Sequence, residues 1–349
     1  VVAGLLSRAL AADPAERYLT AGEMMEDLAK DAGTFVAPGI VVAGQPVGGA
    51  SPEPAVWEKQ LRRALGDDYE LLSELGTGGF GRVYRVRDLH LEREVALKGL
   101  HPGLIQHPAV VERFRRQAHL AARLHQPHIV NIYDIGGRAG LIWYTMEMVE
   151  GPNIARMVER DGPLPWDRVL RIMREGLSAL THAHGASLVH RDIKPENLLI
   201  EERDGGLRIT DFGLAIALRG QARFGGATSQ SGTPQFASPE QLLGARVDPR
   251  TDLYSLAAVA YFALLGRSPF PGRTPEQVLA RQTTDQFPRL TEERTDVPPP
   301  VVRVLRRALR AAPDARYASA AEFLHALNYA DRNAGEEKRP IWAHRWLRG

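Results

Sequence analysis

The segment His190–Asn197 constrains the structure and chemistry of this chain more than any other stretch. Asp192 is a candidate base, Arg191 and Lys194 are cations, and Asn197 carries an amide oxygen that can bind a metal. The segment follows the short apolar run Ser187–Val189. The polar cluster is therefore expected at the edge of a hydrophobic core.

A β-hairpin is predicted directly after this segment. The apolar runs Leu198–Ile200 and Leu207–Thr210 are separated by a turn at Asp204–Gly206. Antiparallel pairing would bring Asn197, before the first run, and Asp211, after the second, to the same end of the hairpin. Amide and carboxylate oxygens are ligands that Mg²⁺ accepts, so these two residues are predicted to hold a divalent metal.

The composition argues against several classes of protein. The chain of 349 residues has 44 basic and 42 acidic residues, so its charge gives no case for nucleic-acid binding, and we expect none. It has no cysteine, which excludes a disulfide framework and fits the cytoplasmic location that we expect. The longest apolar run, Leu253–Leu265, contains Tyr254 and Ser255 and stops at Gly266. It predicts a buried core helix and no membrane span.

Lysine is scarce, with five lysines among the 44 basic residues, so the other 39 are arginine (44 − 5 = 39). The chain uses arginine wherever a general cation is sufficient. Lys98 and Lys194 are therefore candidates for functions that need a compact ammonium group, such as contact with phosphate.

Part of the C-terminal sequence is repeated in the N-terminal region. Residues 1–33 are predicted to be helical, and Arg8–Tyr18 reappears as Arg307–Tyr317 at an offset of 299 (8 + 299 = 307). The alternatives are the tail of a preceding homologous domain and a chance similarity of two helix pairs. Residues 34–56 are rich in proline and glycine and predict a linker, and a short helix is predicted at Trp57–Leu65.

Strands are predicted from Tyr69 onward. Tyr69–Leu75 and Arg82–Asp88 flank the glycine-rich turn Gly76–Gly81. A turn between two strands argues against a dinucleotide-binding turn, and its backbone N–H groups can cover phosphates. In the third strand, Val95–Lys98, a small residue and a lysine share one face. The later elements predicted are a helix at Val110–Leu124, strands at Ile129–Ile135 and Leu141–Met148, a hinge at Gly151–Pro152, and a helix that ends at Gly185.

Five motifs occur together in the order and spacing typical of protein kinases. They are Gly76–Val83, Val95–Lys98, His190–Asn197, Asp211–Gly213 and Ser238–Glu240. Over residues 67–330 the chain resembles the eukaryotic-type (Hanks-type) serine/threonine protein kinases of bacteria. The resemblance implies an α+β, bilobal fold, with a small β-rich lobe at residues 67–148 and a larger, mostly α-helical lobe at residues 149–330. Residues 331–349 then form a basic, aromatic tail.

The resemblance implies ATP and Mg²⁺ (or Mn²⁺) as cofactors and a Ser/Thr hydroxyl of a protein as the substrate. Asp192 is implied to accept the hydroxyl proton, Lys194 to steady the γ-phosphate, Lys98 to hold the α- and β-phosphates, and Thr233 to position Asp192. The implied nucleotide-binding residues are Leu75, Gly76, Gly78, Gly81, Val83, Ala96, Lys98, the gatekeeper Met146, the hinge residues Glu147, Met148 and Val149, and Leu199. The implied metal ligands are Asn197 and Asp211.

The resemblance also implies structural and regulatory contacts. Asp252 is expected to brace the catalytic loop, and Arg316 to pair with Glu240. Arg191 is expected to bind a phosphate on the activation segment, residues 211–240. The candidate phosphorylation sites are Thr228, Ser229 and Ser231, and a homodimer for trans-autophosphorylation is one expected partner.

One position departs from the family pattern. A helix glutamate pairs with the strand lysine in this family, whereas the spacing here places Gln117 at that position. A glutamine can accept a hydrogen bond from Lys98 but supplies no charge. Three interpretations follow: an active but attenuated or tightly regulated kinase, a nucleotide-binding pseudokinase that acts as a scaffold or allosteric partner, or a different ATP-dependent phosphotransferase.

Overall fold

The computed structural model describes residues 54–78, 81–100, 108–212, 234–284 and 288–334. The chain divides into two units, residues 1–48 and residues 49–349, and the first unit lies wholly outside the described residues. The predicted helical segment at residues 1–33 is therefore not described. The same is true of most of the predicted linker and of the tail from residue 335 onward.

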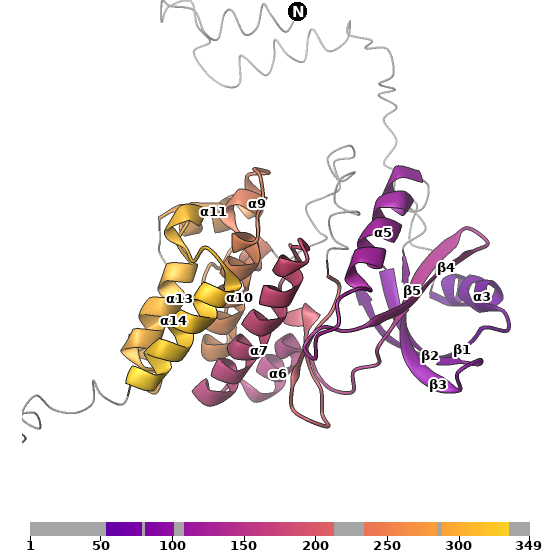
Figure 1. Ribbon diagram of the computed structural model, residues 1–349, viewed down its shortest axis with the longest axis horizontal. Coiled ribbons are helices and arrows are strands. Elements are labelled where there is room, and N and C mark those ends of the chain that lie inside the picture. The colour runs from indigo at the N-terminus through magenta and orange to yellow at the C-terminus, as the bar shows by residue number, and fades with distance from the viewer. Residues whose placement is uncertain (1–53, 79–80, 101–107, 213–233, 285–287, 335–349) are drawn as a thin grey trace, which may run out of the picture. The chain divides into compact units, whose positions relative to one another are not determined.

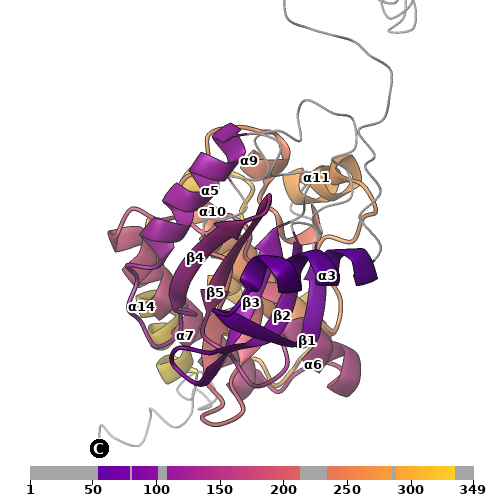
Figure 2. The same cartoon turned by 90° about the vertical axis from the view of Figure 1, so that its right-hand side faces the viewer.

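The small lobe is built on a five-stranded antiparallel sheet with the strand order β1-β2-β3-β5-β4. The strands are β1 (Tyr69–Gly78), β2 (Gly81–Asp88), β3 (Arg93–Leu100), β4 (Ile132–Arg138) and β5 (Leu141–Met146). Two helices, α3 (Pro54–Leu65) and α5 (Pro108–Ala121), cover opposite faces of this sheet (Figures 1 and 2).

Alternation along β3 gives each face of the sheet its own core. Val95 and Leu97 point to the α3 side, where they pack with Trp57 and Leu61. Ala96 belongs to the other cluster, in which α5 supplies Phe114 and Ala118. This second face also borders the cleft between the lobes. The residues of β3 that alternate with Val95 and Leu97 are therefore the ones that a ligand in the cleft can contact.

Two predicted strands have different ends in the structure. The strand predicted at residues 129–135 is observed as β4, which begins only at Ile132. Ile129 and Val130 do not belong to it because they pair instead with Ile209, and Val130 N donates to Ile209 O at 3.0 Å. The strand predicted at residues 141–148 ends at Met146, and the next amide, Glu147 N, donates to Asn131 O at 2.8 Å.

A glycine is required where the chain passes between the lobes. Gly151 has φ of 146°, and a Cβ atom there would lie 2.1 Å from Ile200 O. A larger residue at this position would push the segment that joins the lobes away from the hairpin. The predicted break at Gly151–Pro152 therefore coincides with a close backbone approach.

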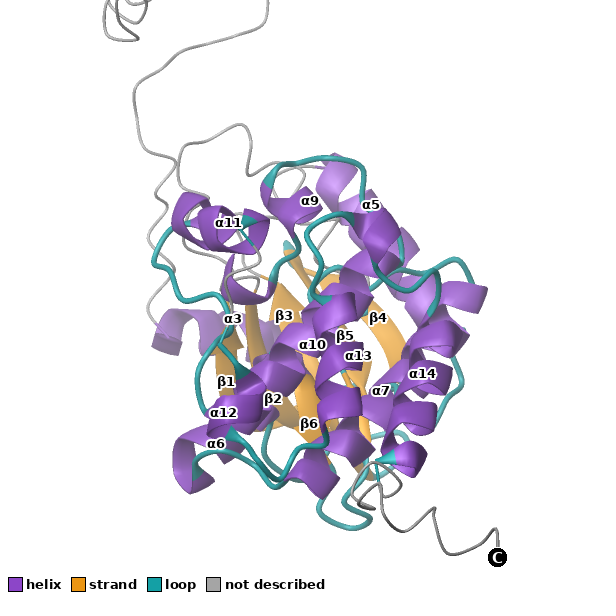
Figure 3. Ribbon diagram, turned by 90° about the vertical axis from the view of Figure 1, so that its left-hand side faces the viewer, coloured by secondary structure: helices purple, strands orange, loops and turns teal. Residues whose placement is uncertain are grey.

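The large lobe is mostly helical (Figure 3). Its α-helices are α6 (Ile154–Asp161), α7 (Trp166–Gly185), α9 (Pro239–Leu242), α10 (Arg250–Leu265), α11 (Pro275–Thr283), α12 (Leu290–Glu293), α13 (Pro299–Ala308) and α14 (Ala320–Asn333). Its short 3₁₀ turns are Pro195–Asn197, Pro234–Phe236 and Pro313–Ala315. Within the described residues, no helix is sufficiently long and apolar to cross a lipid bilayer.

Helix α10 is the centre of the large lobe, as its sequence predicted. Of its residues only Arg250 and Phe262 are not buried, and α7, α13 and α14 pack around it. An apolar helix surrounded by other helices needs no polar face, which explains the long apolar run. The observed α+β, two-lobed architecture confirms the predicted fold class.

A buried ion pair joins two distant parts of the large lobe, again as predicted. Arg316 donates from Nη1 to Glu240 Oε1 and from Nη2 to Glu240 Oε2, both at 2.8 Å. The Arg316 side chain is fully buried and that of Glu240 is 8 % exposed. Arg17, the counterpart of Arg316 in the N-terminal sequence repeat, lies outside the described residues.

Candidate active site

The buried carboxylate of Asp252 holds the catalytic loop by hydrogen bonds to its backbone. Its Oδ2 accepts a hydrogen bond from His190 N at 2.8 Å, and its Oδ1 accepts one from Arg191 N at 2.7 Å. His184 Nε2 also lies 2.8 Å from Oδ2. Arg191 has a left-handed backbone, with φ of 62°, which a non-glycine residue adopts only when its surroundings enforce it. The predicted brace is confirmed, and it includes His184, to which no sequence pattern pointed.

Two side chains of the catalytic loop, those of Asn197 and Lys194, converge on the Asp192 carboxylate. Asn197 Nδ2 donates to Asp192 O at 2.8 Å and to Asp192 Oδ2 at 3.1 Å. Lys194 Nζ lies 3.0 Å from the same Oδ2. The side chains of Asp192 and Lys194 are 9 % and 19 % exposed, so the pair is sheltered but open to the cleft. The amide and the ammonium group hold Asp192 in one orientation.

The hairpin that follows the loop forms as predicted. Strands β6 (Leu198–Ile200) and β7 (Leu207–Ile209) pair antiparallel, with Leu198 opposite Ile209. The pairing extends beyond the strands, because Thr210 N donates to Asn197 O at 3.1 Å. Asn197 and Asp211 therefore come to the same end of the hairpin.

Asp211 is held at both carboxylate oxygens by residues of the small lobe. Lys98 Nζ donates to its Oδ2 at 2.5 Å, and the hydroxyl of Tyr144 donates to its Oδ1 at 2.6 Å. Burial acts to raise the pKa of Asp211, but the charge and hydrogen bond of Lys98, the bond from Tyr144 and the nearby His190 hold this pKa below its ordinary value. Burial and the Asp211 charge raise the pKa of Tyr144 well above its ordinary value, so its hydroxyl remains a donor.

The helix residue Gln117 does not hold the lysine. Among the described residues, no hydrogen bond joins Gln117 to Lys98, whose ammonium group pairs with Asp211 instead. Gln117 lies on α5 between the buried residues Phe114 and Ala121, at helical spacing, and is itself half-buried. Within the described residues, the ammonium group pairs with the Asp211 carboxylate, whereas the family pattern pairs it with a helix glutamate.

A cleft of about 720 Å³ collects most of the residues that the sequence singled out. Its predicted lining residues are Leu75, Gly76, Val83, Ala96, Lys98, Met146, Glu147, Met148, Val149, Asp192, Lys194, Asn197, Leu199 and Asp211. Two predicted residues, Gly78 and Gly81, are not among those that line it. Thr233, Gly213 and the candidate phosphorylation sites Thr228, Ser229 and Ser231 lie outside the described residues.

Other lining residues were not predicted to take part in the site, namely Thr77, Val130, Gly151, Asn153, Ala155, Arg156, Glu159, Glu196 and Thr210. Asn153 had a readable signal, because an asparagine before a helix often caps it, and its side chain does accept a hydrogen bond from Arg156 N at 2.9 Å. Val130 had none, since it enters the cleft only through its pairing with the hairpin at Ile209.

Asn197 and Asp211 are suitable ligands for a magnesium ion that a bound nucleotide would share. Asn197 and Asp211 offer one amide and one carboxylate oxygen group at one end of the hairpin, and both line the cleft. Mg²⁺ commonly takes one or two protein oxygens and completes its shell with phosphates and water. In the described part of the chain, no cluster of three or more acidic or histidine residues offers a site made by protein alone.

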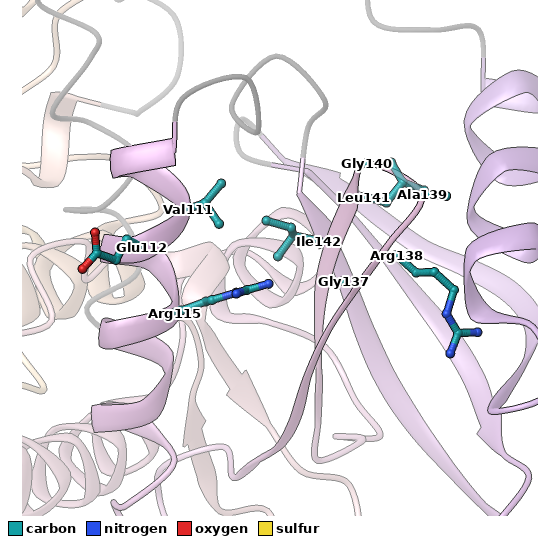
Figure 4. Close-up of a pocket in the computed structure, with 9 residues that line it drawn as sticks. All are labelled: Val111, Glu112, Arg115, Gly137, Arg138, Ala139, Gly140, Leu141 and Ile142. Atoms are coloured by element: carbon teal, nitrogen blue, oxygen red, sulfur yellow. The ribbon is translucent and has the colours of Figure 1, made fainter.

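A second, smaller hollow of about 540 Å³ lies between α5 and the β4–β5 hairpin (Figure 4). Arg115 extends from α5 toward the hairpin, where Ile142 and Gly137 form the opposite wall (Figure 4). None of the residues predicted to act on a nucleotide or a metal lines this hollow. The chemistry is therefore expected in the larger cleft.

Comparison with known proteins agrees with this geometry. The protein kinase domain family matches residues 69–328. The serine/threonine-protein kinase PknB of Mycolicibacterium smegmatis is 38% identical over 266 residues, which cover 74% of this chain and 42% of that protein. PrkC of Bacillus subtilis is 35% identical over 260 residues, covering 74% of this chain and 40% of PrkC. The chain therefore spans less than half the length of these relatives.

A solved structure shows the same fold. The crystal structure of the Mycobacterium tuberculosis PknI kinase domain has a TM-score of 0.61 and 32% identity, and the match covers 75% of this chain and 96% of that one. With the matching family domain and these relatives, the chain belongs to the protein kinase family, among the serine/threonine kinases of the Hanks type that bacteria carry.

Proposed function

We propose that this chain is an ATP-dependent serine/threonine protein kinase that transfers the γ-phosphoryl group of ATP to Ser/Thr hydroxyls. The observation that carries the proposal is the convergence of Lys98, Asp192, Lys194, Asn197 and Asp211 on one cleft. Phosphoryl transfer needs little covalent chemistry, so positioning and charge neutralisation account for most of the catalysis. These five side chains supply both.

Each residue has a role that its contacts support. Asp192, oriented by Asn197 and Lys194, accepts the proton of the substrate hydroxyl. Lys194 lies 3.0 Å from that carboxylate and lines the same cleft, which supports a role in steadying the γ-phosphate. Lys98 holds the α- and β-phosphates, while Asn197 and Asp211 hold Mg²⁺ or Mn²⁺. When bound, the metal neutralises phosphate charge.

The shape of the cleft supports an adenine nucleotide. Ala96 lies on the small-lobe side and Leu199 on the large-lobe side, so the two can enclose a planar base. Met146 is buried, and it lines the cleft together with the next three residues, Glu147–Val149. We expect the backbone of these three residues to bind the base. ATP as the phosphate donor also implies a cytoplasmic site of action.

The proposal concerns the kinase domain, because the relatives are longer than this chain. The protein substrate and a homodimer for trans-autophosphorylation remain proposals that rest on the family alone. The scaffold alternative receives no support from the relatives, which are all named as kinases. The intact set of Lys98, Asp192, Asn197 and Asp211 also favours catalysis.

The deciding experiment is an autophosphorylation assay with phosphosites mapped by mass spectrometry. Purified protein with Mg²⁺ and ATP is expected to incorporate phosphate on serine and threonine, and chelation of the metal by EDTA should stop the reaction. If the protein binds ATP but phosphorylates neither itself nor a generic basic protein, the result would favour the pseudokinase scaffold over the active kinase.

Restoring the helix acid is expected to raise activity. In Gln117→Glu, a carboxylate on α5 can give Lys98 a second charged partner and leave Asp211 freer for the metal. Because no hydrogen bond joins Gln117 to Lys98, the variant would add a charge-assisted bond, and a gain of ~1–2 kcal/mol in the transition state corresponds to roughly a tenfold rate increase. Steady-state kcat/KM for ATP measures the effect, with Gln117→Ala as the control. An unchanged or lower rate would show that Gln117 does not limit this kinase.

A further inference from the structure

We propose that the Tyr144 hydroxyl is a positioning group for Asp211, and that it fixes the orientation in which this carboxylate binds the nucleotide-bound metal ion. The inference rests on the proposed function for the role of Asp211. It assigns to strand β5 a part in metal binding that the kinase motifs do not contain, in a chain that lacks the helix glutamate at Gln117.

The two bonds on Asp211 act at different oxygens. Lys98 takes Oδ2 and Tyr144 takes Oδ1, at 2.5 and 2.6 Å. One bond from the flexible lysine would leave the carboxylate plane free to turn about its Cβ–Cγ bond. The second bond, at the other oxygen, removes this freedom. A carboxylate has about four lone-pair sites, so two bonds leave acceptor sites for a metal.

The sheet makes the position of Tyr144 rigid. In the β3–β5 pairing Lys98 lies opposite Tyr144, so both groups start from neighbouring backbone positions. The Tyr144 side chain is 1% exposed, and its ring packs against Phe114 of α5 with 5.8 Å between ring centroids. The ring thus has little freedom to move. Its hydroxyl reaches Asp211 from strand β5 and not from helix α5.

The missing helix acid makes this contact more important. Because Gln117 is neutral and makes no hydrogen bond with Lys98, the lysine relies on Asp211 as its carboxylate partner in the described structure. A lysine free to shift toward phosphate would pull Asp211 with it unless another group held the carboxylate. Tyr144 is the second group that the structure shows on Asp211. Partners that orient a metal ligand typically contribute 10- to 100-fold to metal affinity or activity.

The test compares Tyr144→Phe with Tyr84→Phe. The first substitution removes only the hydroxyl on Asp211. The second removes a hydroxyl from another buried tyrosine of the same sheet, 2% exposed and packed in the α3 core. The primary readout is Mn²⁺ affinity of the complex with a non-hydrolysable ATP analogue, measured from the EPR signal of free Mn²⁺. The second readout is affinity for the analogue without metal.

In Tyr144→Phe we expect the Mn²⁺ dissociation constant to rise about tenfold or more. We also expect analogue affinity without metal to stay within about twofold of wild type, because the outer-shell effect acts on the metal. Tyr84→Phe should match wild type in both. In steady-state assays, Tyr144→Phe should need about tenfold more Mg²⁺ for half-maximal rate, with kcat largely recovered at high Mg²⁺.

Three results would overturn the inference. They are wild-type Mn²⁺ affinity in Tyr144→Phe, an equal loss of metal-free nucleotide affinity, and no Mn²⁺ binding by the wild-type complex. The proposed function fails separately, since a wild-type protein that binds Mn²⁺ and nucleotide but transfers no phosphate still allows the two tyrosine variants to be compared.

Discussion

Asp192→Asn is expected to reduce phosphoryl transfer by about 100-fold to 10,000-fold, the range that a positioned general base contributes. The asparagine has almost the same size and can still accept a hydrogen bond from Asn197 and Lys194 through its amide oxygen. It cannot take up the proton of the attacking hydroxyl. The loss should therefore fall on the chemical step and leave ATP binding nearly unchanged.

Two measurements separate chemistry from binding for this variant. Single-turnover rates with saturating Mg²⁺-ATP report the transfer step, and calorimetry with a non-hydrolysable analogue reports affinity. Glu202→Gln, which neutralises an exposed acid after strand β6, is the matched control and should retain the wild-type rate. If Asp192→Asn keeps more than about a tenth of the wild-type rate, Asp192 is not the base in this chain.

Much of this site could be read from the sequence, because its parts are local. The catalytic loop and the hairpin lie within residues 190–211, and a two-strand unit with a glycine turn has one plausible pairing. The brace from Asp252 and the pair between Arg316 and Glu240 were obtained only from the family resemblance. No periodicity in the chain links residues 76 positions apart.

The partner of Lys98 could not be read from the sequence. Tyr144 faces Lys98 only because β3 pairs with β5, while α5 and β4 lie between them along the chain. The family pattern directed attention to Gln117, whereas the lysine pairs with Asp211 across the cleft. Likewise, the ends of β4 depend on Ile129 and Val130 pairing with β7, a tertiary contact that propensity does not encode.

Arg316→Met is expected to destabilise the protein by about 3–5 kcal/mol at neutral pH, because it leaves the buried Glu240 carboxylate without its counter-charge. Arg316 also donates to Arg310 O at 2.7 Å and to Ala311 O at 2.8 Å, so the same change leaves two carbonyls without this donor. The double variant Arg316→Met/Glu240→Gln should recover part of the loss, since no buried charge remains unpaired.

The exposed pair between Arg250 and Asp314 provides the control for this prediction. The Asp314 side chain is 95% exposed, and Asp314→Asn should cost less than about 1 kcal/mol. Urea unfolding followed by circular dichroism measures all three variants. A loss in Arg316→Met no larger than that in Asp314→Asn would show that the buried pair contributes no more than a surface one.

The destabilisation by Arg316→Met should also depend on pH. Burial acts to raise the pKa of Glu240, but the hydrogen bonds and charge of Arg316, with help from Thr251, hold it below its ordinary value of 4.5. The pair's contribution is therefore fully present above pH 4.5 and is lost as the pH falls through the lower folded-state pKa. The gap in unfolding free energy between wild type and Arg316→Met should narrow below pH 4.5. A gap that stays constant down to the acid transition would instead assign the loss to packing, for example to the Arg316 guanidinium over the Tyr254 ring at 4.7 Å.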